Sequence, residues 1–146
     1  MSDTGSAAIP ADLHRRIVEQ ADEAIIFADR DGIIRLWNRG AEKLFGYTEA
    51  DALGRNLHLI VPERFRAAHD EGYRRALAAG VTRYAGRVMT TRSQTKDGAR
   101  IYIDMSFGLV KDDAGTVRGA FAVARDCTAR QLERMASRQG AAPGPA

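Results

Sequence analysis

The sequence contains little cysteine and no long hydrophobic run. Its single cysteine, Cys127, cannot form a disulfide within the chain, which is typical of a protein in a reducing cytoplasm. No apolar segment approaches the roughly 20 residues that a membrane-spanning helix needs. The N-terminal segment MSDTGSAAIPADL has neither a basic start nor an apolar core, so it does not resemble a secretory signal. We therefore expect a cytoplasmic protein that does not enter a membrane.

The residue groupings on which most enzymes depend are also lacking. There is no glycine-rich phosphate loop, no pair of catalytic carboxylates, and no set of nucleophile, base and orienting residue. One cysteine and three scattered histidines do not have the spacing of a zinc site. The net charge of +3 is small and spread along the chain, which does not indicate direct nucleic-acid binding. We expect a protein that is not an enzyme.

The composition that is present is that of one globular domain. The chain has 146 residues, of which 45% are hydrophobic and 28% are charged, enough to form a buried core. Residues 1–9 are mostly small and polar, and residues 139–146 (QGAAPGPA) have nothing to bury, so we predict disorder at both ends. The predicted domain spans residues 10–127, followed by a helix over residues 128–138.

The hydrophobic pattern predicts an antiparallel sheet interrupted by helices. We predict strands at residues 24–28, 33–37, 84–91, 101–110 and 117–126. We predict helices at residues 11–21, 39–45, 62–77 and 128–138. Asn38 and Thr48 are expected to cap short helices, and Thr128 has the spacing of a capping box with Gln131. The sum is an α+β fold: a five-stranded antiparallel sheet with short helices on one face and a flanking helix at each end.

The helix predicted over residues 62–77 carries a histidine on its apolar side. The apolar stripe consists of Phe65, Ala68, Gly72, Tyr73, Ala76 and Leu77, and His69 lies within it. Such a histidine is ordinarily a core or rim residue that bonds to a carbonyl oxygen. Because Gly72 has no side chain, it would leave room for a ligand beside the imidazole.

The order of the elements and three motifs resemble the PAS family of sensory domains. The motifs lie at residues 29–56 (DRDGIIRLWNRGAEKLFGYTEADALGRN), 96–106 (KDGARIYIDMS) and 125–131 (RDCTARQ). The resemblance implies the PAS fold and a sensory function. In that function a small ligand or cofactor binds in an internal cavity, and the change passes through the sheet and exit helix to an effector. The effector would be a histidine kinase, a cyclase or a transcription regulator.

Within this family, PERFRAAHD followed by YAGRVM resembles the haem-binding PAS domains of oxygen-sensing histidine kinases. The resemblance implies haem b with His69 as the axial ligand of its iron. Oxygen, nitric oxide or carbon monoxide would then bind on the opposite face, beside Arg87, Met105 and Phe107. Arg75 matches an arginine that pairs with a haem propionate.

A departure from the pattern of the haem-binding members leaves alternatives open. The aromatic residue that the haem-binding members have three positions after the histidine is Gly72 here, and it follows one position later as Tyr73. A PAS domain with no cofactor, or with an unidentified small molecule, would act as a module for dimerisation and relay. A flavin photosensor is not supported, because Cys127 lies at the exit of the last strand rather than in the helical region. The sequence does not decide whether His58 lies at the surface or near the pocket. We also expect a homodimer through the terminal helices.

Overall fold

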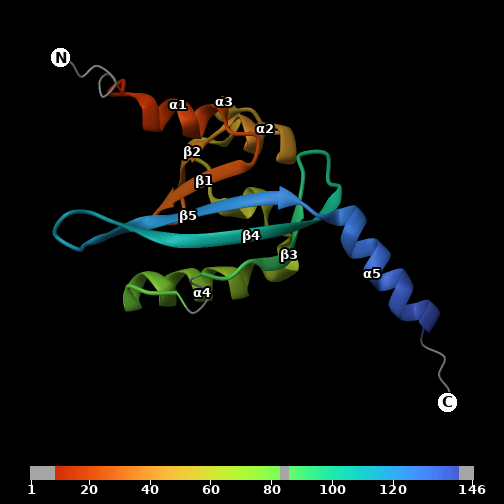
Figure 1. The fold of residues 1–146 in the computed structure, drawn as a ribbon. Helices are drawn as coiled ribbons and strands as arrows, with labels where there is room; N and C mark the ends of the chain where they lie inside the picture. The colour runs from red at the N-terminus through yellow and green to blue at the C-terminus, as the bar shows by residue number, and fades with distance from the viewer. Residues whose placement is uncertain (1–8, 83–85, 142–146) are drawn as a thin grey trace.

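The computed structural model describes residues 9–82 and 86–141. Its centre is a five-stranded antiparallel sheet in the order β2-β1-β5-β4-β3 (Figure 1). The strands are β1 (Ala24–Asp29), β2 (Ile34–Trp37), β3 (Met89–Gln94), β4 (Arg100–Lys111) and β5 (Val117–Asp126). The helices are α1 (Leu13–Gln20), α2 (Arg39–Phe45), α3 (Glu49–Ala52), α4 (Arg66–Ala79) and α5 (Thr128–Ala141), with 3₁₀ turns η2 (Leu57–Ile60) and η3 (Glu63–Phe65). The predicted α+β fold is confirmed.

The two short helices begin at the predicted caps. The side chain of Asn38 accepts a hydrogen bond from the Ala41 amide at 2.9 Å, and that of Thr48 accepts one from the Asp51 amide at 3.1 Å. These bonds satisfy amides that have no partner inside the first turn of a helix. Gly46 then ends α2 in the left-handed conformation that glycine adopts without strain.

The third strand begins later than its sequence suggests. We predicted residues 84–91, but β3 is Met89–Gln94, and residues 84 and 85 lie outside the described residues. The register runs from Met89 opposite Met105 to Gln94 opposite Arg100, and a tight turn at Thr95–Gly98 closes the hairpin. Because most residues of β3 are polar, the pairing with β4 determines the strand, and the hydrophobic pattern does not reveal it.

One face of the sheet packs on the helices and forms the core. Ala24, Ile26, Ile103 and Ala124 belong to a buried cluster that the strands share with α2, α3 and η2. The predicted alternation along β4 is confirmed near its start, where Ile103 is buried and Ile101 and Met105 pack against that cluster. The opposite face is less covered; Phe121, for example, is 38% exposed.

The two flanking helices lie at different sides of the sheet. α5 projects away from the domain, and the described N-terminal helix lies on the far side of the molecule (Figure 1). α5 continues to Ala141, so the disorder that we predicted from residue 139 begins too early. The other predicted disordered residues, apart from residue 9, lie outside the described part. Among residues 9–82 and 86–141, no helix has both the length and the apolar character to span a membrane.

Candidate functional site

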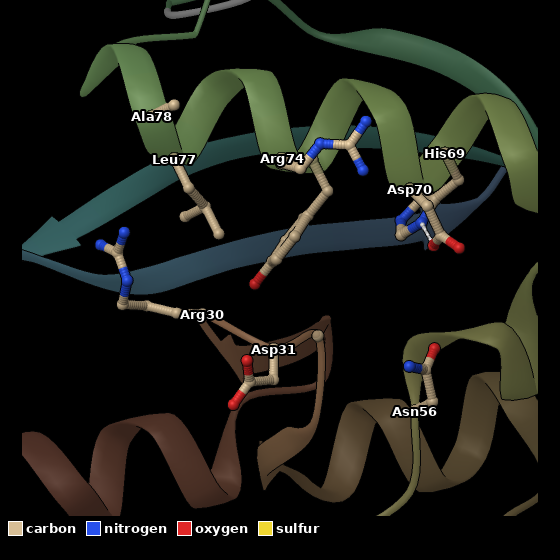
Figure 2. A pocket seen from close by; sticks show the side chains of 10 residues that line it. Arg30, Asp31, Asn56, His69, Asp70, Arg74, Leu77 and Ala78 are labelled. Carbon is tan, nitrogen blue, oxygen red and sulfur yellow. Dashed lines mark hydrogen bonds and ion pairs between the residues drawn. The ribbon is translucent and has the colours of Figure 1, made fainter.

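A hollow of about 310 Å³ lies between α4, the β1–β2 turn and the segment before η2 (Figure 2). This volume is at the lower end of the roughly 300–1,000 Å³ of small-molecule sites. His69, Asp70, Tyr73, Arg74, Leu77 and Ala78 line it from α4, and Arg30, Asp31, Gly32 and Asn56 from the opposite side. Of the predicted cofactor residues, His69 alone belongs to the described lining.

The inner face of α4 differs from the predicted apolar stripe. Leu77 is buried, and His69 and Tyr73 are half-buried, so a row with four-residue spacing faces the hollow. By contrast, Phe65 is 36% exposed and Gly72 is exposed. Apart from the chain neighbours of Gly72 and the backbone of the adjacent turns of α4, no described atom lies within 4 Å of the position that a Cβ of Gly72 would occupy. The space at Gly72 therefore opens to solvent and does not lie beside the imidazole.

Tyr73 determines which face of α4 turns inward. Its hydroxyl lies 3.0 Å from the carbonyl oxygen of Ala28 and 2.7 Å from that of Asp29, at the end of β1. It donates its single proton to this pair of acceptors. Burial raises the pKa of Tyr73 to about 12, so the hydroxyl remains a donor at neutral pH. This contact ties the middle of α4 to β1.

His69 lies next to a second histidine and a carboxylate. Its Nδ1 is 3.5 Å from Asp70 Oδ1, and the same oxygen is 2.7 Å from Nε2 of His58. The ring of His69 also stacks on that of Tyr73, with centroids 5.9 Å apart. Burial lowers the pKa of His69, so its imidazole is neutral at neutral pH, and the hydrogen bond with His58 lowers the pKa of Asp70.

No local pattern in the sequence assigns a role to His58, and the structure places it beside Asp70 and His69 at the edge of the hollow. The side chain of Asn56 accepts a hydrogen bond from the His58 amide at 2.9 Å and so begins η2. Arg66 of α4 donates to the carbonyl oxygens of His58 and Val61, which holds η2 against the helix. His58 and His69 are 11 positions apart, a separation at which no local pattern indicates that two side chains meet.

The other predicted site residues lie elsewhere. Arg75 is on the outer surface of α4, with its side chain 71% exposed, and pairs with Glu71 at 3.2 Å. Arg87 is exposed and precedes β3, so it is not on the strand where we placed it. Met105 and Phe107 occupy alternate positions of β4, and Met105 packs against the core. None of these four residues is among the described residues that line the hollow beside His69.

A second group of contacts fixes the start of α5 to β4. Arg130 donates to both carboxylate oxygens of Asp104, at 2.6 and 2.7 Å, and Thr90 donates to the same carboxylate at 2.7 Å. The Arg130 guanidinium holds the pKa of Asp104 well below its usual range. The exit helix is therefore joined to the sheet by a two-point ion pair.

Thr128 does not cap α5 in the way that the capping-box pattern predicted. Its hydroxyl accepts a hydrogen bond from the Tyr102 amide of β4 at 2.9 Å, and its own amide donates to Asp126 at 2.8 Å. The hydroxyl therefore adds a second connection between the start of α5 and β4.

A sheet of this order, with helices over one face and a hollow beneath the longest of them, is the architecture of a small α+β sensory domain. The chain belongs to the PAS fold family, which matches residues 18–132.

Several known proteins are similar to this chain. The sensor protein FixL of Bradyrhizobium diazoefficiens is 31% identical over 94 residues, which are 64% of this chain and 19% of FixL. The oxygen sensor protein DosP of Escherichia coli is 28% identical over 116 residues, which are 80% of this chain and 14% of DosP. The chain thus spans less than a fifth of either relative. An RNA-binding Light-Oxygen-Voltage receptor of known structure superposes with a TM-score of 0.70 and 27% identity, over 96% of this chain and 41% of that one.

The residues around His69 do not fit haem b in their present arrangement. Haem iron bound to His69 would lie at a ring nitrogen, in the plane of the imidazole, and Nδ1 already lies 3.5 Å from the carboxylate of Asp70. The charged side chains of Arg30, Asp31, Asp70 and Arg74 also line the hollow, whereas a porphyrin needs apolar walls. Of the other residues matched to haem contacts, Arg75 and Arg87 are exposed.

Proposed function

We propose that this PAS domain is a sensory relay module whose signal enters at the hollow beneath α4 and leaves through α5. The proposal rests on two contacts, one between the hollow and the sheet and one between the sheet and α5. Tyr73 ties the hollow to β1, and the Asp104–Arg130 ion pair ties β4 to α5.

The strands between these connections are hydrogen-bonded neighbours. Ala28, one of the two acceptors of Tyr73, pairs with Ala120 of β5, and β5 leads directly into α5. Arg125 near the end of β5 pairs with Asp104 of β4. A small occupant that moved Tyr73 would therefore alter a strand that is continuous with the exit helix. Such an occupant shifts the domain only by its difference in affinity for two states, typically about 1–3 kcal/mol.

The proposal extends to partners. Because the chain spans less than a fifth of FixL and of DosP, an effector domain or protein would receive the change from α5. A homodimer through the terminal helices would cover apolar side chains that the described chain leaves exposed. Ile17 of α1 is 57% exposed and Leu132 of α5 is 52% exposed.

The relay predicts that a change at the hollow reaches α5. We expect Tyr73→Phe, which removes only the hydroxyl, to speed hydrogen exchange of the first-turn amides of α5 by about fivefold. In an Arg130→Gln background the same substitution should have little further effect, because the connection to α5 is already lost. Hydrogen–deuterium exchange with mass spectrometry measures both effects.

Tyr47→Phe is the matched control for this experiment. Tyr47 is partly buried and packs against the core, but it does not line the hollow. It should leave α5 exchange unchanged. Equal exchange at α5 in wild type and Tyr73→Phe would refute the relay.

The competing proposal is an oxygen sensor with haem b on His69. The relative named as an oxygen sensor protein favours it. We expect no Soret band from the protein expressed with a haem supply, because charged side chains line the hollow beside His69. A Soret band that disappears in His69→Ala and persists in His14→Ala would establish haem binding instead.

A further inference from the structure

Three potential metal ligands meet at the edge of the hollow. His58 comes from η2, and His69 and Asp70 are consecutive residues of α4. One ligand atom from each lies within 4.8 Å of the other two. Each imidazole is 32% exposed and the Asp70 side chain is 51% exposed, so an ion could reach all three from solvent. Figure 2 shows His69 and Asp70 side by side on α4, with Asn56 across the hollow.

We propose that His58, His69 and Asp70 bind a divalent first-row transition metal ion. Two imidazoles and one carboxylate form a ligand set that suits Zn²⁺ and Fe²⁺ and leaves coordination positions open. Ligands at about 2.0–2.2 Å from one ion lie roughly 3–3.6 Å apart. The separation of His69 Nδ1 from Asp70 Oδ1, 3.5 Å, is already in this range, and that of His58 Nε2 from the same oxygen, 2.7 Å, must widen slightly. The ligand nitrogens of the two histidines, which lie within 4.8 Å of each other, must approach by about 1 Å at most. The hydrogen bond between His58 and Asp70 is replaced by coordination to the shared ion.

The surroundings hold the ligands near this arrangement. Arg66 bonds to the carbonyl oxygens of His58 and Val61, so the turn that carries His58 is fixed to the helix that carries the other two ligands. Asp31 lines the same hollow and adds a second carboxylate to the electrostatic field of the site.

The cations nearby are engaged by other groups. Arg74 pairs with Glu71, and Arg30 donates to the carbonyl oxygen of Val117 at 2.7 Å. Both guanidinium groups are therefore held by other partners, which reduces their repulsion of the proposed ion.

This inference deepens the proposed function by naming a metal ion as the occupant of the hollow. Its signalling consequence rests on that function, whereas metal binding itself does not. Coordination would draw Asp70 and His69 toward η2, on the α4 turn next to Tyr73. The open positions would allow the ion to bind a further small ligand from the hollow.

The test uses the untagged chain of 146 residues, freed of metal with a chelator and titrated with Zn²⁺ by calorimetry and with Co²⁺ by visible absorption. We expect one ion per chain and Co²⁺ bands typical of low coordination number. His58→Ala, His69→Ala and Asp70→Asn should each weaken binding by about 100-fold or more. His14→Ala removes the remaining histidine, which is exposed on α1, and should bind as wild type does.

The possible outcomes distinguish the metal site from the relay to α5. If His69→Ala fails to fold, His58→Ala on the short η2 turn carries the same test. Wild-type affinity no higher than that of a His58→Ala, His69→Ala double variant would overturn the metal site and leave the relay standing. Stoichiometric binding with no change in α5 exchange would confirm the site and overturn its part in signalling.

Discussion

Replacing Asn38 with alanine is expected to lower the free energy of unfolding by about 3–5 kcal/mol, because unpaired buried polar groups each cost about 1–3 kcal/mol. Asn38 is only 3% exposed. Its side-chain oxygen accepts from the amides of Ile25 and Ala41, at 2.8 and 2.9 Å. Its side-chain nitrogen donates to the carbonyl oxygens of Val18 and Glu23, at 2.7 and 3.0 Å. Alanine removes every one of these bonds and leaves polar groups around α1, β1 and α2 without partners.

Urea denaturation of three variants distinguishes this connecting role from simple capping. Thr48→Ala removes the exposed cap of α3 and should cost about 1 kcal/mol. Asn38→Asp keeps both acceptor contacts but sets a buried carboxylate oxygen against the carbonyl oxygens of Val18 and Glu23, so its cost should equal or exceed that of Asn38→Ala. An Asn38→Ala variant no less stable than Thr48→Ala would show that Asn38 acts as a cap alone.

Replacing Gly40 with alanine is expected to destabilise the protein by about 2–4 kcal/mol, at or above the usual cost of overpacking. A Cβ at Gly40 would lie 2.1 Å from the carbonyl oxygen of Glu23 and 2.5 Å from that of Asp22. Because both atoms belong to the backbone, relief requires α2 to move away from the segment that leads into β1. In an isolated helix the same substitution would instead be favourable by about 1 kcal/mol.

Gly72→Ala is the matched control, since it makes the same change in the interior of α4. Beyond its chain neighbours and the adjacent backbone of α4, no described atom lies within 4 Å of the Cβ position there, so the helix propensity of alanine should raise stability by about 0.5–1 kcal/mol. Opposite signs for the two variants in thermal or urea unfolding are the expected result. A stabilised Gly40→Ala protein would mean that α2 does not pack on the segment before β1 as described.

Local features of the sequence predicted most of the fold. The turn DRDG, the caps at Asn38 and Thr48 and the alternation along β4 all depend on residues close together in the chain, and each is present. The third strand was predicted too early, because its polar residues become a strand only by pairing with β4.

The candidate site was predicted less completely. His69 was correctly expected to turn toward the interior, whereas Arg87 was placed on a strand that begins after it. His58 could not be connected with Asp70, because their contact depends on η2 folding against α4. The residues on the inward face of α4 were predicted only in part. The hydrogen bonds of Tyr73 to β1 orient this helix, and a pattern of apolar residues does not reveal them.

The sequence by itself determined the order of strands and helices, the hairpins and the capped helices. These follow from backbone preferences and side-chain alternation, which act over a few residues. The tertiary structure decided that Gly40 tolerates no side chain while Gly72 does. It also decided that two histidines 11 positions apart share one carboxylate. Such outcomes arise from contacts between segments that meet only when the chain is folded, and the physical cause is the steric and hydrogen-bonding fit between them.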